Sequence, residues 1–215
     1  MNDQDWHWTP ADQHFALHWQ GTRRCLSSAA LNGGVCEANR LLNLKVSGAD
    51  SQQPPEQTLQ QYADSQGWTA TTVGMMTAAS MDSLRWAETT IEGERLAIYL
   101  TSGLSNARCA GDPADWQNPV TLPPGTINIV CISNMQLSVA SMTEIITLLT
   151  EAKAHVLHKA NIRSPVSGEL ATGTGTDSIA VIGGSGKPQR WFGKHTLAGQ
   201  RCAELLIQCL TDSIV

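Results

Sequence analysis

The chain has 215 residues, of which 41% are hydrophobic and 15% are charged, a balance typical of a globular protein with a sizeable core. Its formal net charge of −5 argues against a general nucleic-acid-binding protein, which needs a basic surface to contact phosphates. No segment approaches the roughly 20 apolar residues that cross a bilayer, and residues 1–10 lack the apolar segment of a signal peptide, so we expect a cytoplasmic protein without membrane insertion.

The first part of the chain contains short apolar runs that end at turn residues, a pattern typical of strands. Residues 54–67 indicate a short helix instead, because proline stands at the start, glycine follows the end, and Leu59, Tyr62 and Ala63 share one side. The strands are expected within residues 23–31, 43–48, 69–78, 94–103 and 125–133.

Residues 136–160 contain neither glycine nor proline and predict the longest helix. At 100° per residue, Lys153 falls on the apolar side of this helix and Glu151 on the opposite, polar side. A lysine on an apolar stripe either extends outward to solvent or meets a carboxylate or a polar substrate group, and we favour Asp177 or a substrate amide oxygen as its partner. The expected apolar stripe consists of Met142, Ile145, Ile146, Leu149, Ala152, Val156 and Leu157.

A further strand is expected within residues 178–184, and residues 196–210 predict an amphipathic C-terminal helix. Strands and helices are mixed along the chain without a fixed repeat, so we predict an α/β or α+β fold with a single-layered mixed sheet and two long late helices packed on it. We expect one domain over residues 23–215, with residues 1–22 as an extension ordered on this core. The expected buried stripe of the last helix is Leu197, Ala203, Leu206 and Leu210.

The cysteines form no C-x-x-C pair, and most have apolar neighbours, which favours buried free thiols over disulfides or a metal site. His155 and His158 could join Glu151 around a metal ion, but their spacing matches no zinc motif, so we expect none. The six cysteines are Cys25, Cys36, Cys109, Cys131, Cys202 and Cys209.

Eight short motifs together resemble one family. In chain order they are SSAALNGG, NRLLNLKV, VGMMTAAS, TSGLSNARCAG, GTINI, TEAKA, ATGTGTDSI and GKHTLAGQ. Their order and spacing, from about residue 25 to about residue 207, resemble the adenosylcobinamide amidohydrolases. The resemblance implies hydrolysis of the amide that joins aminopropanol to the corrin side chain of adenosylcobinamide, yielding adenosylcobyric acid and 1-amino-2-propanol. It places the reaction in coenzyme B12 salvage, with the corrinoid as substrate. The sequence itself indicates no cofactor requirement.

The loop over residues 170–179 is the first candidate for the chemistry of amide hydrolysis. Such a reaction needs an activated nucleophile, donors that stabilise the tetrahedral oxyanion, and a proton for the departing amine. Gly173 and Gly175 allow the backbone to turn its N–H groups inward, although an ordinary glycine turn would have the same composition. The loop lacks the lysine of a P-loop, so a nucleotide site is not expected. Its hydroxyl donors are Thr172, Thr174 and Thr176.

The candidate catalytic residues are Thr174, Thr176 and Asp177 of the loop together with Lys153, Glu151 and His195. Asp177 could orient a base, and His195, which lies within a family motif, could take a proton from water and return it to the amine. A solvated histidine at a helix start is the alternative for His195, and a solvated surface stripe is the alternative for Glu151. A threonine nucleophile also stays open.

Polar loop residues that follow or end strands are candidates for binding the substrate, because corrin carries a rim of amides. Asn32 and Asn106 are the preferred candidates. Two alternatives remain, a non-catalytic corrinoid-binding or sensing module and a hydrolase of another amide, and the chain could form a homo-oligomer. The candidate binding residues are Asn32, Gly33, Gly34, Ser102, Asn106, Asn128, Thr172, Gly173 and Gly175.

Overall fold

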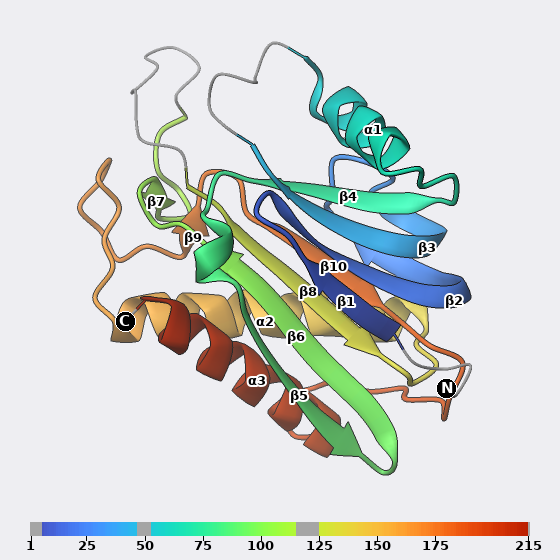
Figure 1. The fold of residues 1–215 in the computed structure, drawn as a ribbon. Helices are drawn as coiled ribbons and strands as arrows, with labels where there is room; N and C mark the ends of the chain where they lie inside the picture. Colours follow the sequence, from blue (N-terminus) through green and yellow to red (C-terminus); the bar gives the residue numbers. More distant parts are fainter. Residues whose placement is uncertain (1–5, 47–52, 115–124, 215) are drawn as a thin grey trace.

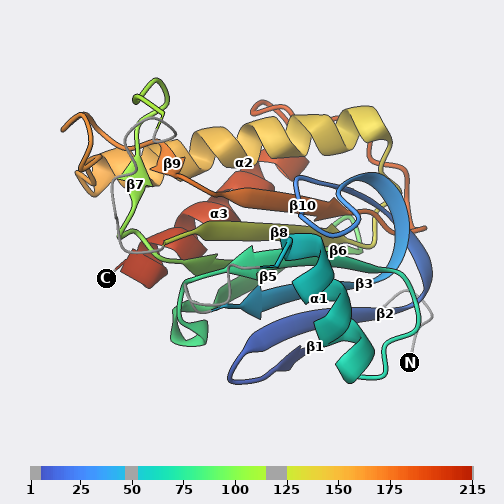
Figure 2. The ribbon, with the colours of Figure 1, turned by 90° about the horizontal axis from the view of Figure 1, so that it is seen from above.

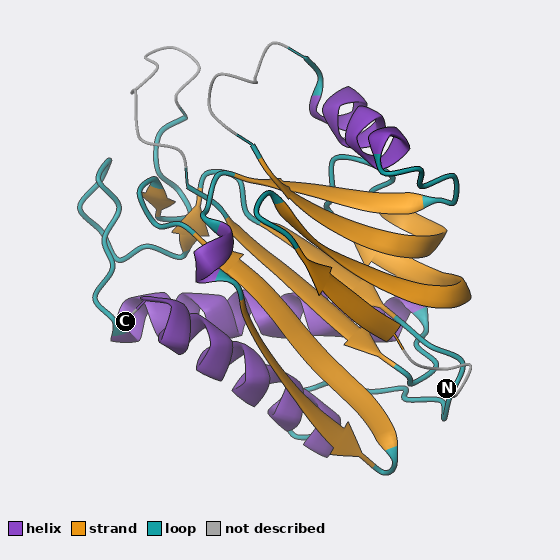
Figure 3. Ribbon diagram, in the orientation of Figure 1, coloured by secondary structure: helices purple, strands orange, loops and turns teal. Residues whose placement is uncertain are grey.

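The computed structural model describes residues 6–46, 53–114 and 125–214, which form a mixed sheet with three α-helices (Figure 3). A 3₁₀ turn lies at Met81–Ser83. The strands are β1 (Trp6–Pro10), β2 (His14–Ser27), β3 (Gly34–Lys45), β4 (Thr72–Thr77), β5 (Arg85–Ile91), β6 (Glu94–Ser102), β7 (Ala107–Arg108), β8 (Ile127–Ser133), β9 (Gly173–Thr174) and β10 (Ser178–Ile182). The helices are α1 (Pro55–Ser65), α2 (Val139–Lys159) and α3 (Leu197–Ile214).

The large sheet has the strand order β4-β3-β2-β10-β8-β6-β5, and β1 pairs with β2 beside this path. Strands β3 and β4 are parallel, as are β10 and β8, whereas the other neighbours are antiparallel. The two late helices α2 and α3 cover one face of the sheet (Figures 1 and 2). The predicted mixed sheet with two late helices packed on it is therefore confirmed. Strands β7 and β9 form a separate two-stranded ribbon.

Strand β2 makes the sheet fold over on itself. Its register with β3 shifts between His18 and Arg23, its first part also pairs with β1, and its last residues also pair with β10. Strand β1 consequently lies over β5 and β6, where the indole N–H of Trp6 donates to the hydroxyl of Tyr99 at 3.2 Å. A second core fills the space between the two parts of the sheet. It includes Phe15, Leu17, Trp19, Val73, Met75, Tyr99, Val130, Ile132 and Ile182.

The main core lies between the helices and strands β6, β8 and β10. Because side chains alternate along a strand, Ile98, Ile129 and Val181 face the helices while their neighbours face the second core. The predicted stripe of α2 is buried except for Ile146, which is half-buried. The predicted stripe of α3 is buried at Leu206 and Leu210 and half-buried at Ala203. It is wrong at Leu197, which is the first residue of the helix and is 53% exposed.

The remaining expectations concern the N-terminal segment and the cysteines. Residues 6–10 and 14–22 belong to β1 and β2, so this segment is part of the sheet. The described cysteines form no disulfide; four are buried, and Cys36 and Cys109 are half-buried. No helix in the described part of the chain has the length and apolarity needed to cross a bilayer.

Candidate active site

The loop after β9 lies where α2 approaches the end of the sheet at which β8 and β10 begin (Figure 1). Strand β9 pairs with β7, so that Thr174 stands opposite Ala107. The loop ends at Asp177, directly before β10. The ribbon and the start of β10 therefore hold the threonine-glycine loop on both sides.

An ion pair between Lys153 and Asp177 joins this loop to α2. The Lys153 Nζ donates to Asp177 Oδ2, and the two side chains are only 8% and 12% exposed. The expectation that Lys153 reaches Asp177 from the apolar side of its helix is confirmed. A Cβ atom on Gly173 would overlap the Asp177 carboxylate and lie 2.8 Å from Lys153 Nζ, so the close approach requires glycine there.

The Asp177 carboxylate accepts three further hydrogen bonds. Thr174 donates its backbone N–H to Oδ2 at 3.0 Å and its hydroxyl to Oδ1, and the Ile127 N–H donates to Oδ1 at 3.1 Å. Each carboxylate oxygen thus accepts two bonds, which occupies its usual acceptor positions. Asp177 holds α2, the loop and the start of β8 in one arrangement, with the Thr174 hydroxyl oriented toward a carboxylate.

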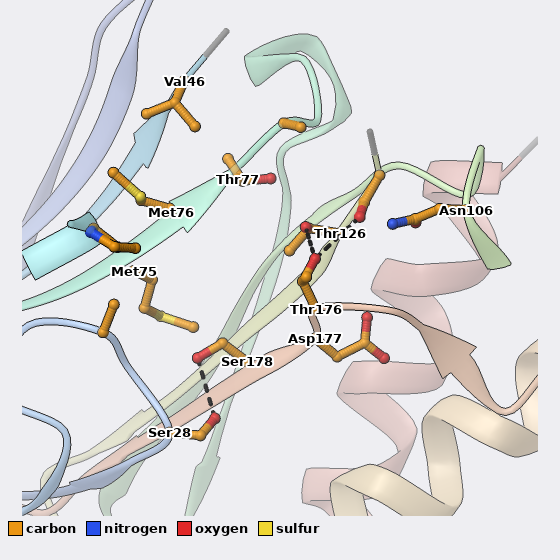
Figure 4. A pocket seen from close by; sticks show the side chains of 14 residues that line it. Ser28, Val46, Met75, Met76, Thr77, Asn106, Thr126, Thr176, Asp177 and Ser178 are labelled. Atoms are coloured by element: carbon orange, nitrogen blue, oxygen red, sulfur yellow. Dashed lines mark hydrogen bonds between the residues drawn. The ribbon is translucent and has the colours of Figure 1, made fainter. Parts of the chain in front are cut away.

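Two cavities meet at Thr176 and Asp177. The first, which we call the methionine cavity, has a volume of about 400 Å³ and is shown in Figure 4. The second, the lysine cavity, has a volume of about 620 Å³ and includes Lys153. The methionine cavity is lined by Ser28, Ala30, Val46, Pro55, Met75, Met76, Thr77, Ala78, Asn106, Gly125, Thr126, Thr176, Asp177 and Ser178. The other residues of the lysine cavity are Arg108, Cys109, Ala110, Thr150, Glu151, Ala154, Thr172, Gly173, Thr174 and Gly175.

The junction of the two cavities offers hydrogen-bond donors. Gly175 and Thr176 are exposed, and their backbone N–H groups donate to no acceptor in the described part of the chain. The Thr176 hydroxyl lies 2.6 Å from that of Thr126 and 3.3 Å from the carbonyl oxygen of Gly125. Free backbone N–H groups in a cavity that Lys153 also lines can donate hydrogen bonds to an anionic oxygen.

Two other predicted catalytic residues lie further out. Glu151 is on the polar side of α2, lines the lysine cavity and forms an exposed ion pair with Lys194. His195 is exposed before α3 and lines neither cavity. The structure thus brings Lys153, Thr174, Thr176 and Asp177 together and leaves His195 outside this group, so its acid–base role stays a prediction.

Most of the predicted binding residues outside the loop make contacts within the protein instead of lining a cavity. The Asn32 side chain donates to the carbonyl oxygen of Thr72 at 2.8 Å, Gly33 packs against the carbonyl oxygen of Ala29, and Gly34 begins β3. The Ser102 hydroxyl donates to that of Ser213 at 2.9 Å.

Asn128 belongs to a buried polar network and is itself fully buried. Its Nδ2 donates to Asn43 Oδ1 at 2.6 Å and to the carbonyl oxygen of Met76 at 2.7 Å. Asn43 in turn donates to the Thr101 hydroxyl at 3.0 Å. This network holds the start of β8, and Asn128 lines neither cavity. The described residues contain no group of three or more His, Cys, Asp and Glu side chains that could hold a metal ion.

Asn106 is the predicted binding residue outside the loop that does line a cavity. Sequence reasoning missed the walls formed by Met75, Met76 and Thr126. The two methionines stand in the motif VGMMTAAS. Apolar residues in a strand predict burial in the core, so the sequence did not indicate that they line a cavity.

Comparison with known proteins identifies the family. A family model described as adenosylcobinamide amidohydrolase matches residues 6–215. The chain belongs to this family. The chain is 27% identical over 154 residues to an adenosylcobinamide amidohydrolase of Methanosarcina mazei, a match that covers 72% of this chain. It is 30% identical over 157 residues to an uncharacterised protein of Methanocaldococcus jannaschii, covering 66% of this chain.

The match covers 66% of the length of the Methanosarcina mazei protein and 62% of the length of the Methanocaldococcus jannaschii protein. Two solved structures are similar to the chain at a greater distance. A Burkholderia beta-aminopeptidase gives a TM-score of 0.47 at 9% identity, covering 95% of this chain and 79% of its own. A Pyrococcus horikoshii protein gives a TM-score of 0.45 at 10% identity, and the match covers 100% of this chain and 80% of that protein. Both likenesses are too distant to bear on the site.

Proposed function

We propose that this protein hydrolyses adenosylcobinamide at the amide between aminopropanol and the corrin side chain, releasing adenosylcobyric acid and 1-amino-2-propanol. Membership of the family and the name of the Methanosarcina mazei relative support this substrate. The observation that carries the chemistry is the junction of two cavities, where Lys153 and the free N–H groups of Gly175 and Thr176 lie together. The reaction would serve the salvage of incomplete corrinoids in the cytoplasm.

The two cavities suit a substrate with two arms on either side of one amide. Their volumes of about 400 and 620 Å³ lie within the range of small-molecule sites. A corrin ring is too large to be enclosed by either, so the side chain bearing the amide enters the junction and the ring stays over the rim. The acyl side and the aminopropanol side then extend into different cavities.

In this arrangement the scissile carbonyl oxygen faces the N–H groups of Gly175 and Thr176. These donors and the positive charge of Lys153 stabilise the negative charge that the oxygen gains when the carbon becomes tetrahedral. The hydroxyl group of water is transferred to the carbonyl carbon, the C–N bond breaks, and the remaining proton of water goes to the departing amine. Thr174, held by Asp177, stands beside the attacked carbon to orient the incoming group.

The test is to incubate the purified protein with adenosylcobinamide and to analyse the mixture for adenosylcobyric acid and free aminopropanol. We expect both products in equal amounts. The variant Thr174→Ala should lower turnover at least tenfold, whereas Thr174→Ser keeps the hydroxyl and should retain most of it. Tight binding without products would favour a corrinoid-binding or sensing module, and absence of both binding and turnover would contradict every corrinoid function.

A further inference from the structure

We propose that Asn106 is a further catalytic residue, whose side-chain amide donates a hydrogen bond to the oxygen of the scissile carbonyl. This inference rests on the proposed function, because it assigns a role within the same site. It differs from the expectation that Asn106 binds an amide on the corrin rim, since the contact is placed at the reacting group.

The position of Asn106 is tied to the catalytic loop by the β7–β9 ribbon. Asn106 directly precedes β7, whose first residue, Ala107, pairs with Thr174. Asn106 lines the methionine cavity together with Thr176 and Asp177, and its side chain extends toward them (Figure 4). The loop and Asn106 therefore keep a constant spacing across the junction.

The carboxamide of Asn106 has no hydrogen-bond partner in the described part of the chain. Its Oδ1 is buried and unpaired, and its Nδ2 lies 3.6 Å from the point where a Cβ atom on Gly175 would stand. A buried acceptor without a partner, such as Asn106 Oδ1, costs free energy, so most folded proteins satisfy such groups. An amide that is left unpaired beside the two free N–H groups of the loop is positioned to act on a ligand.

Gly125 allows the carboxamide to lie this close to the loop. A Cβ atom at this position would stand 2.7 Å from Asn106 Oδ1 and 2.6 Å from the carbonyl oxygen of Gly103. The carbonyl oxygen of Gly125 also accepts the Thr176 hydroxyl at 3.3 Å. Any side chain at residue 125 would push Asn106 away from Thr176, which links this glycine to the placement of the donor.

A neutral amide donor at the carbonyl oxygen acts most strongly when that oxygen becomes anionic. Its removal therefore lowers kcat and leaves KM almost unchanged, because the interaction is made chiefly in the transition state. A contact with the corrin rim would have the opposite signature, a higher KM at unchanged kcat. The two roles of Asn106 are thus separable by kinetics alone.

The experiment compares Asn106→Ala and Asn106→Asp with wild-type protein in the hydrolysis of adenosylcobinamide. Asn106→Asp keeps the shape but replaces the NH₂ donor with an oxygen. We expect kcat to fall by about 100-fold or more in both variants, with KM within about threefold of wild type. Ser105→Ala, at the exposed neighbouring residue, is the control and should keep both constants.

Thermal unfolding of each variant shows whether it is folded. If Asn106→Ala does not fold, the kinetic comparison is made with Asn106→Asp alone. A rise in KM at constant kcat, or wild-type values in a folded variant, would overturn this role while leaving the proposed reaction intact. A wild-type protein that releases no adenosylcobyric acid would instead contradict the proposed reaction and this role together.

Discussion

Lys153 and Asp177 meet as a nearly enclosed ion pair between a helix and the loop that precedes β10. The two charged groups differ in the number of their hydrogen-bond partners. Asp177 accepts three hydrogen bonds in addition to that from Lys153, whereas Lys153 has Asp177 as its ion-pair partner. Removing either partner leaves the other charge buried, which is far more costly than the loss of a surface ion pair.

A double-mutant cycle on this pair should show strong coupling. We expect Asp177→Asn to destabilise the protein by about 3–5 kcal/mol, because the Lys153 charge is left without a counter-charge. Lys153→Met should cost less, because Asp177 keeps its other three donors. The double variant should be more stable than the sum of the two losses predicts. Urea unfolding measures the three free energies, and strict additivity would show that the two side chains do not interact.

Gly173 and Gly175 form a matched pair for a second prediction. A Cβ atom on Gly173 would overlap the carboxylate of Asp177, so Gly173→Ala should separate Lys153 from Asp177 and lower both stability and turnover. A Cβ atom on Gly175 would meet only Asn106 Nδ2, at 3.6 Å, an ordinary contact. We therefore expect the unfolding midpoint of Gly175→Ala to stay close to wild type. Equal midpoints for the two variants in thermal unfolding would argue against the steric role of Gly173.

The sequence predicts the polar loop over residues 170–179 from its local composition. It predicts the unusual position of Lys153 from the periodicity of the helix that carries it. Lys153 is conspicuous on an apolar stripe, and threonines and glycines before an apolar strand indicate a polar loop. The pairing of Lys153 with Asp177 follows because a buried ammonium needs a counter-charge. These elements required no knowledge of the strand order.

Features that depend on long-range packing were not predictable in the same way. Strand β5 alternates half-buried and exposed residues up to the buried Ile91 and contains no apolar run that would predict a strand. The folding-over of the sheet depends on the register shift in β2 and on contacts such as that of Trp6 with Tyr99. The methionine cavity lies between β4, which carries Met75, and the start of β8 and β10, strands that are not neighbours of β4 in the sheet. Strand order, and with it the position of His195, could not be read from spacing.

His195→Ala tests whether the histidine in the family motif takes part in the reaction. His195 is exposed and lines neither cavity, so we expect the variant to keep kcat within about threefold of wild type. Its pH–rate profile should also match that of the wild type. Lys194→Ala, which removes the exposed ion pair with Glu151, is the neighbouring control and should behave alike. A loss of tenfold or more in kcat for His195→Ala alone would instead support the acid–base role that the sequence predicts for His195.

His18 and His14, which lie away from the site, should make the free energy of unfolding depend on pH. His18 Nδ1 accepts from Arg40 Nε at 2.9 Å, its Nε2 lies 3.2 Å from the Thr9 hydroxyl, and its ring stacks on His7 at 5.1 Å. Burial, followed by the nearby positive charge of Arg40, lowers the pKa of His18 to about 4. Burial also lowers the pKa of His14, whose Nδ1 lies 2.8 Å from the Tyr62 hydroxyl.

The folded state therefore resists protonation of His18, whereas the unfolded chain binds that proton at its ordinary pKa of about 6.5. The stability contributed by neutral His18 is fully present above about pH 7 and is lost as the pH falls from 6.5 toward 4. Since the side chain is only half-buried, solvent screening reduces the effect to about 1–2 kcal/mol, or a fall in Tm of about 3–6 °C. Melting curves between pH 7.5 and 4.5 should show a smaller fall in Tm for His18→Gln than for the wild type. His155→Asn, at an exposed histidine, should follow the wild type, and a His18→Gln protein that also follows it would contradict this assignment.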